Sequence, residues 1–223
     1  MYLSKMPLNR RRRGAVKLLS SPQAMHAAVQ SAFAPGSFVE SEGRALWRVD
    51  ELGRDGIALY VVSPVEPDLS HVVEQAGWQT GEMWKSVEYG GFLAGLRAGQ
   101  RWGFRLRANP VHSVYKSDKA WGDTKPVAHL TVKHQQTWLL DRAAKCGFAI
   151  PDGPQHEAAL RVVDRSTLKF NKGGHSVTIG TATFEGVLQV EDPVLLRSVL
   201  TNGLGRAKAY GCGLITLAPL GIG

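Results

Sequence analysis

The sequence predicts an α+β fold in two successive units, and three observations support this. Strand-like and helix-like segments in the first half follow the order β-α-β-β-(α)-β, which is that of a ferredoxin-like unit. Two long alternating segments in the second half flank Lys172-Gly173-Gly174, a hairpin signal. A helix, a glycine-rich loop and an apolar strand then complete a second unit. With 223 residues, the chain can bury a core in one or two domains.

The first unit is expected over residues 1–111, beginning with a strand and a helix. Tyr2–Leu8 alternates as a strand does, and Pro7 favours an edge or a strand end. Ser21-Pro22 predicts a helix start, because serine caps the N-terminus and proline suits the first helical position. From Met25 onward, apolar residues recur at i, i+3, i+4, i+7 and i+8, which predicts one apolar helix face.

Three more strands and a short helix are expected to complete this unit. Ala45–Glu51 and Gly56–Ser63 predict two strands joined by a turn, and Leu69–Ala76 predicts a short helix. Trp78–Tyr89 indicates no clear element. Gln100–Ala108 alternates and is expected to be the last strand. Its apolar face holds Trp102, Phe104 and Leu106. Its basic face holds Arg101, Arg105 and Arg107.

A polar linker over 112–126 is expected to lead to the second unit, 127–223. That unit starts with Val127–Lys133, followed by a helix over roughly His134–Cys146 with Gly147 as its stop.

Leu160–Asn171 and His175–Val190 are expected to pair as a long hairpin. Period-two alternation predicts one basic face on the first strand, with Arg161, Arg165 and Lys169. The alternative is an ordinary solvated sheet face.

The glycine-rich segment lies between a predicted helix, Asp192–Thr201, and a predicted strand, Leu214–Leu217. Four glycines and the two cations Arg206 and Lys208 fall within twelve residues. Glycine permits positive φ, so successive N–H groups can form an anion nest to which the cations add charge. The order helix, loop, strand is the reverse of a nucleotide-cofactor loop, so an extended polyanion is favoured. The alternative is a glycine-rich connection that binds no ligand.

Basic residues exceed acidic ones by 27 − 19 = 8, which favours an acidic partner, either nucleic acid or an anionic membrane surface. No acid precedes Glu40, and this N-terminal segment carries Arg10, Arg11, Arg12, Arg13 and Lys17. A four-arginine run is usually a solvated loop, but with the C-terminal cations it favours nucleic acid. No apolar run of membrane-spanning length, signal-peptide core or cationic amphipathic helix is evident. The two distant cysteines fit a reducing compartment. A cytoplasmic protein that binds no membrane is therefore expected.

No metal site or small-molecule cofactor is expected. The seven histidines show no HxH or HExxH spacing, and there is no G-x-S-x-G motif. His26 lies about 90° from the centre of the apolar stripe of its helix, at the boundary of the buried face. An imidazole there can be held by packing and still reach a ligand. The alternative is a histidine that only packs at the helix edge.

RNA carries its own nucleophile, because its 2′-OH can attack the adjacent phosphate if protons are transferred and the developing charge is stabilised. A basic protein with one well-placed histidine could therefore cleave RNA without a metal, but could not cleave DNA by this route.

The chain also resembles the CasE branch of CRISPR-associated endoribonucleases, the repeat-processing subunit of type I-E Cascade. The resemblance covers nearly the whole length and rests on five segments: Met1–Lys5, Met25-His26, Phe104–Pro110, Phe184–Leu188 and Gly203–Pro219.

The resemblance implies two tandem ferredoxin-like (RRM-like) βαββαβ domains. It also implies metal-independent cleavage on the 3′ side of the CRISPR repeat hairpin, leaving a 2′,3′-cyclic phosphate, continued binding of the product stem-loop, and partnership with other Cascade subunits. The catalytic histidine of the family matches His26 by position. A tyrosine that assists in some members is replaced by Gln23, so this role is open between Lys17, Ser31, another cation or no residue. The basic hairpin of the second domain matches Arg161–His175.

The resulting hypothesis is an endoribonuclease that processes CRISPR repeat RNA, with His26 as general acid or base. The residues expected to bind RNA are Arg10, Arg11, Arg12, Arg13, Lys17, Arg161, Arg165, Lys169, Arg206 and Lys208. The alternative is a non-catalytic RNA-binding subunit of a ribonucleoprotein, in which His26 is merely packed.

Overall fold

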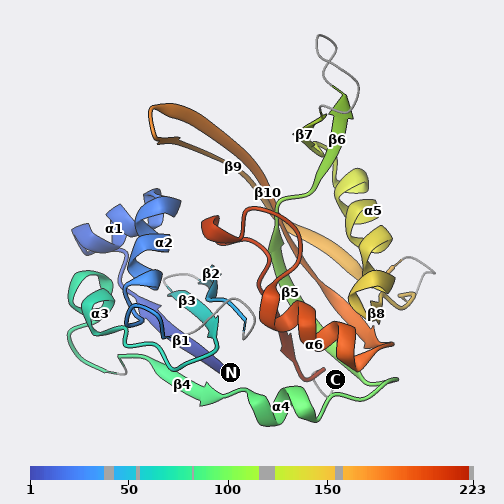
Figure 1. Ribbon diagram of the computed structural model, residues 1–223, viewed down its shortest axis with the longest axis horizontal. Coiled ribbons are helices and arrows are strands. Elements are labelled where there is room, and N and C mark those ends of the chain that lie inside the picture. The colour runs from blue at the N-terminus through green and yellow to red at the C-terminus, as the bar shows by residue number, and fades with distance from the viewer. Residues whose placement is uncertain (38–42, 54–55, 82, 116–123, 154–157, 221–223) are drawn as a thin grey trace. The chain divides into compact units, whose positions relative to one another are not determined.

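The computed structural model describes residues 1–37, 43–53, 56–81, 83–115, 124–153 and 158–220 (Figure 1). The chain divides into two compact units. The first comprises Met1–Leu96 with Arg197–Leu214, and the second Arg97–Leu196 with Ile215–Gly223. Each unit is built around one antiparallel sheet.

The sheet of the first unit has the strand order β2-β3-β1-β4, and each neighbouring pair is antiparallel. The strands are β1 (Tyr2–Leu8), β2 (Leu46–Leu52), β3 (Gly56–Ser63) and β4 (Lys85–Glu88). Together with the helices between them, this is the arrangement of a ferredoxin-like unit. The helices are α1 (Arg13–Ser20), α2 (Pro22–Gln30) and α3 (Ser70–Ala76), with α4 (Gly90–Ala94) after β4.

The three helices between the strands share one hydrophobic core with the sheet. Alternation along β1 sends Met6 and Leu8 into this core, while Met25 and Val29 enter it from α2. The predicted start of α2 is confirmed, because the Ser21 side chain accepts a hydrogen bond of 3.2 Å from the amide of Ala24.

One local feature of the first unit follows the prediction from the sequence, and one is not predicted. Pro7 lies where β1 pairs with β3 alone, since β4 pairs only with Tyr2–Lys5. The missing N–H of proline is tolerated at such an edge, as the sequence predicts. The sequence does not predict helix α1. The helix begins within the arginine run, and with only Ala15 and Leu18 buried it shows too short an apolar pattern to be recognised.

The second sheet has the order β11-β5-β10-β8, with β9 paired to β10. Its strands are β5 (Arg101–Ala108), β8 (Phe148–Ala149), β9 (Leu160–Lys172), β10 (His175–Val190) and β11 (Ile215–Ala218). The helices of this half are α5 (Val132–Ala143), extended by a 3₁₀ turn, η2 (Ala144–Cys146), and α6 (Pro193–Asn202). Leaving β9 aside, the sequence β5-α5-β8-β10-α6-β11 is again ferredoxin-like. The predicted α+β fold of two ferredoxin-like units is confirmed.

The assignment of the strand over Gln100–Ala108 to the first unit is wrong. The strand exists, but β5 pairs with β10 and β11, so it opens the second sheet. The first sheet is instead completed by β4, inside the Trp78–Tyr89 segment. The expected boundaries 1–111, 112–126 and 127–223 therefore do not coincide with the two sheets. Periodicity predicts that a strand forms but not which strand it pairs with.

Part of the expected linker 112–126 forms a second hairpin. β6 (Val111–Tyr115) pairs with β7 (Thr124–Ala128), and residues 116–123 of that expectation lie outside the described residues. The Val127–Lys133 segment divides between the end of β7 and the start of α5. Thr131 begins that helix by accepting a 3.2 Å hydrogen bond from the amide of His134. The predicted stop at Gly147 is confirmed by its φ of 77°.

The long hairpin turns as predicted, but its register differs from simple alternation. Gly173 and Gly174 have φ values of 56° and 80° and close a two-residue turn between β9 and β10. Further along, Thr183 pairs with Asp164 but Phe184 pairs with Val162, so the strand carries one extra residue, a bulge.

The bulge reverses the phase of the side chains along β9. Arg161 lies opposite Glu185, whereas Arg165 and Lys169 lie opposite Ala182 and Thr178. Odd and even residues of β10 face opposite sides. The prediction that these three cations share one face is therefore wrong: Arg161 faces one side and the other two face the opposite side.

Candidate active site

A pocket in the first unit brings together side chains from three separate segments. It is lined by His26 and Gln30 of α2, by Gly43, Arg44 and Ala45 before β2, and by Lys208 and Ala209 of a 3₁₀ turn, η3 (Lys208–Tyr210). Its volume is about 260 Å³. Of the residues that the sequence indicates for catalysis or RNA binding, His26 and Lys208 line it.

His26 lies at the edge of the buried face of α2, as predicted. Its neighbours Met25 and Val29 are 1% and 0% exposed, which fixes the helix against the sheet. The imidazole itself is half-buried, with Nδ1 shielded from solvent. Since His26 also lines the pocket, an imidazole at this position can reach a bound ligand and exchange a proton with it.

The glycines of the loop after α6 allow close packing against β2. A Cβ on Gly203 would lie 2.8 Å from the Leu46 side chain, and one on Gly211 would lie 2.6 Å from the ring of Trp47. Both glycines also have positive φ, 77° and 76°. Only glycine satisfies both conditions. The structural reason for these two glycines is thus tight packing, and the anion nest inferred from sequence stays a prediction.

Lys208 starts η3 directly after Ala207, whose φ of 59° is left-handed. Ala207 is the only non-glycine residue with positive φ in the part of the chain that the structure describes. The Lys208 stem passes close to Gly213, where an added Cβ would lie 3.3 Å from Cγ. The pKa of Lys208 is lowered, first by burial and second by the positive charge of Arg44. Both causes penalise the ammonium form.

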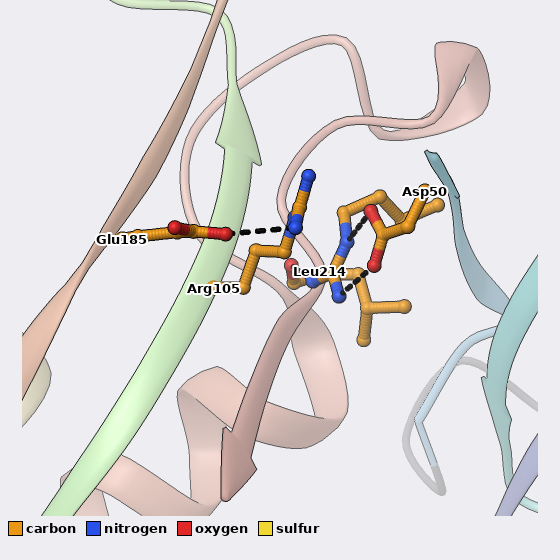
Figure 2. A network of polar contacts seen from close by, with 5 residues as sticks. Asp50, Arg105, Glu185 and Leu214 are labelled. Atoms are coloured by element: carbon orange, nitrogen blue, oxygen red, sulfur yellow. Dashed lines mark hydrogen bonds and ion pairs between the residues drawn. The ribbon is translucent and has the colours of Figure 1, made fainter. Parts of the chain in front are cut away.

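The end of the glycine loop is anchored by a buried ion pair (Figure 2). The Arg48 guanidinium donates to both carboxylate oxygens of Asp50, at 2.7 Å each, and its Nη1 donates to the carbonyl of Leu214 at 3.0 Å. The ring of Tyr60 lies 5.6 Å from this guanidinium. Since Leu214 directly follows the loop, this network fixes the loop to β2.

The N-terminal cations have different environments. Arg12 donates to the carbonyls of Val73, Glu74 and Gly77 at the end of α3, so its charge completes that helix. Arg10 pairs with Glu51 at 3.0 Å on the surface. The remaining predicted cations of this segment are exposed and do not line the pocket: Arg11, Arg13 and Lys17. Arg206 is exposed on the glycine loop and also lies outside the pocket lining.

In the second unit, Arg161 and Lys169 are exposed on β9, and Arg165 donates to the carbonyl of Leu130 at 3.1 Å. The alternating faces predicted for β5 are confirmed: Phe104 and Leu106 are buried. On the other face, three arginines contact polar partners: Arg101 with Gln189, Arg105 with Glu185 (Figure 2) and Arg107 with Ser166.

Other features of the described residues bear on the chemistry. No group of three or more His, Cys, Asp or Glu side chains in the described ranges could hold a metal ion. The rings of His112 and His134 lie 4.7 and 5.9 Å from that of His129, and burial, followed by these neighbouring charges, lowers the pKa of His129. Among the helices in these ranges, none has the length and apolar character needed to cross a membrane.

Arg44 is the pocket residue that sequence reasoning misses. It stands among acidic and small residues in a segment with no periodicity. Its charge gives no signal until the fold places it beside Lys208. Lys208, by contrast, can be found from the sequence, because it lies within a glycine-rich segment.

The chain thus combines two ferredoxin-like units with a pocket that contains a histidine and two cations. The chain belongs to the family described as CRISPR associated protein, which matches residues 1–219. The family resemblance stated from the sequence is thereby confirmed.

Two relatives and one solved structure are similar to the chain. The CRISPR-associated endoribonuclease Cse3 of Thermus thermophilus is 29% identical over 226 residues, covering 98% of this chain and all of the relative. The CRISPR system Cascade subunit CasE of Escherichia coli is 35% identical over 127 residues, covering 52% of this chain and 57% of the relative. A solved structure of Cse3 bound to a 19 nt RNA has a TM-score of 0.78 at 31% identity, covering 98% of this chain and 99% of that one.

Proposed function

We propose that this protein is an endoribonuclease that cleaves CRISPR precursor RNA on the 3′ side of the repeat stem-loop and stays bound to the product. The observation that carries the proposal is the pocket in which His26 meets Lys208 and Arg44. Support comes from the similarity of nearly the whole chain to a CRISPR-associated endoribonuclease, and from the likeness to a structure of such an enzyme with RNA.

The chemistry suits these side chains. The 2′-OH of RNA attacks the adjacent phosphorus as its proton leaves, the bond from phosphorus to the 5′-oxygen breaks, and that oxygen takes up a proton. The products are a 2′,3′-cyclic phosphate and a 5′-hydroxyl, and no metal is consumed or required. His26 can carry one of the protons, and the cations stabilise the extra negative charge of the pentacoordinate phosphorus.

RNA is held by phosphate contacts outside the pocket in this proposal. The exposed cations Arg11, Arg13 and Lys17 of the N-terminal segment, Arg206 of the glycine loop, and Arg161 and Lys169 of β9 are free to approach an RNA backbone. Arg10, Arg12 and Arg165 contribute charge while also bonding to protein groups. By analogy with the Cascade subunit to which it is similar, the protein acts beside other Cascade subunits. The proposal places this activity in the cytoplasm.

The direct test incubates the purified protein with a repeat hairpin in EDTA and maps the product ends. Cleavage on the 3′ side of the stem-loop, leaving a 2′,3′-cyclic phosphate, is expected. His26→Ala is expected to lower the cleavage rate about 10²–10⁴-fold. The matched control is His134→Ala, which removes an exposed histidine outside the pocket and is expected to leave the rate unchanged.

A 2′-deoxy substitution at the scissile nucleotide separates this proposal from a purely RNA-binding role. Binding of the deoxy hairpin is expected to persist while cleavage stops. Tight binding without cleavage of the unmodified hairpin would instead identify a non-catalytic subunit.

A further inference from the structure

We propose that Lys208 is the general acid that protonates the departing 5′-oxygen, that Arg44 holds the scissile phosphate beside it, and that His26 is therefore the base. This assignment rests on the function proposed above and names the second proton-transfer group of the same site.

The argument begins with the groups that line the pocket. Two of its side chains carry a group that can donate or accept a proton, the imidazole of His26 and the amine of Lys208. The Gln30 amide does not titrate, and the Arg44 guanidinium stays charged. Cleavage requires a base for the 2′-OH proton and an acid for the 5′-oxygen. His26 and Lys208 can fill these two roles.

Charge in the pocket indicates what occupies it. Lys208 and Arg44 lie close enough for their charges to repel, since Arg44 lowers the pKa of Lys208. No carboxylate is among the described lining residues, and neither cation has a hydrogen bond or ion pair with another described residue. A phosphodiester between them would place a negative charge beside both cations.

The backbone and stem of Lys208 are held by the residues around them. The left-handed Ala207 directs the chain into η3, and η3 packs against α2, the helix that carries His26. The Lys208 stem lies against Gly213, and the next residue, Leu214, is anchored by Arg48. A positioned ammonium loses little freedom on reaching its substrate, which is what general acid catalysis requires.

Protonation states decide which group does which task. At neutral pH a lysine ordinarily carries its proton, whereas a histidine is ordinarily largely neutral. In this assignment Lys208 donates the proton and His26 accepts one. Partial burial and Arg44 weaken the hold of Lys208 on its proton, which makes it a better donor to an alkoxide as the bond from phosphorus to the 5′-oxygen breaks. Exchange with water restores both groups afterwards.

The test uses two repeat hairpins that differ in one atom. One has the natural 5′-oxygen at the scissile bond, and the other has sulfur there. A thiolate leaves without needing a proton, so the sulfur substrate bypasses the acid. Lys208→Ala is expected to slow cleavage of the natural hairpin about 10²–10⁴-fold and to cleave the sulfur hairpin within about tenfold of the unsubstituted protein. His26→Ala is expected to remain slow on both.

Lys208→Arg separates acid catalysis from charge. Arginine keeps the positive charge but does not release its proton. This variant is expected to bind the 2′-deoxy hairpin as tightly as the unsubstituted protein, to cleave the natural hairpin slowly, and to recover on the sulfur hairpin. Lys145→Arg changes an exposed lysine outside the pocket and serves as the matched control. Arg44→Gln is expected to slow cleavage of both hairpins, because holding the phosphate matters for either leaving group.

Each contrary result has a defined meaning. If Lys208→Arg cleaves the natural hairpin at the normal rate, Lys208 contributes charge and is not the acid. If the sulfur hairpin rescues His26→Ala but not Lys208→Ala, the two roles are reversed. Either result overturns this assignment while cleavage by the unsubstituted protein upholds the proposed function. If the unsubstituted protein cleaves neither hairpin, the proposed function itself fails.

Discussion

Replacing Asp50 by Asn tests how strongly the buried ion pair holds the first unit and its glycine loop. The pair with Arg48 has two hydrogen bonds of 2.7 Å (Figure 2). Its side chains are only 2% and 5% exposed. Asp50→Asn removes the negative charge but leaves the guanidinium buried. Breaking one side of a buried pair typically costs about 3–5 kcal/mol, because the remaining charge is no longer compensated.

The second unit supplies a control of the same chemistry. Arg105 and Glu185 also approach to 2.7 Å (Figure 2), but their side chains are 30% and 32% exposed. Water screens such a pair, so Glu185→Gln is expected to cost about 1 kcal/mol or less. Both pairs join a guanidinium to a carboxylate at 2.7 Å. They differ in burial and also in geometry, because Arg48 donates to both oxygens of Asp50.

Urea unfolding of the full chain measures both changes. At a slope of about 2 kcal/mol per M, Asp50→Asn is expected to lower the midpoint by about 1.5–2.5 M, and Glu185→Gln by about 0.5 M or less. Because Arg48 also binds the carbonyl of Leu214, Asp50→Asn is further expected to slow RNA cleavage below the midpoint. Equal midpoint shifts for the two variants would refute the reasoning from burial.

Three other outcomes follow from single contacts. Lys208→Met is expected to stabilise the free protein at pH 7. A folded pKa lowered below that of the unfolded chain costs stability in full at low pH and less as pH rises through the folded pKa, so the gain in unfolding midpoint should shrink in alkaline buffer. Arg12→Ala is expected to cost about 1–2 kcal/mol in a thermal or urea melt, because carbonyls at the end of α3 lose their donors. Arg11→Ala, at an exposed side chain, should cost almost nothing. Gly211→Ala adds a clash with a buried tryptophan of β2 to the backbone strain, whereas Gly36→Ala, at a φ of 74° with open space around it, adds strain alone. The first should therefore destabilise more, by about 1–3 kcal/mol, in the same melts.

Features determined by a few neighbouring residues could be predicted from the sequence. The serine cap of α2 and the Gly173-Gly174 turn depend on local backbone conformation, and both occur as predicted. The border position of His26 follows from helical periodicity alone. Each of these predictions needs only the residues within one turn of a helix or hairpin.

Features that depend on distant pairing could not be predicted in this way. β5 alternates as a strand should, yet nothing in its residues shows that it pairs with β10 and not with β1. β4 has four residues and mostly exposed side chains, so it leaves no apolar pattern. The bulge at residues 162–164 is a matter of register between two strands, and one added residue is enough to move Arg161 to the other face.

The candidate site combines both cases. Sequence reasoning finds His26 by its place on a helix and Lys208 by its glycines, but their meeting in one pocket depends on how η3 packs against α2. Arg44 enters from a third segment and is recognisable only after that packing is known.

The expected stabilisation by Lys208→Met also bears on why the lysine is there. A partly buried ammonium beside a second cation, in a pocket whose described lining has no carboxylate, is unfavourable in the free protein. That cost is removed when a phosphodiester binds between the cations, so it favours the RNA complex over the empty site. A substitution that stabilises the free protein while slowing cleavage is the behaviour expected of a functional group held at the expense of stability. If Lys208 were only part of the packing of the glycine loop, removing its charge would leave cleavage intact and its stem could be replaced by methionine without a change in rate.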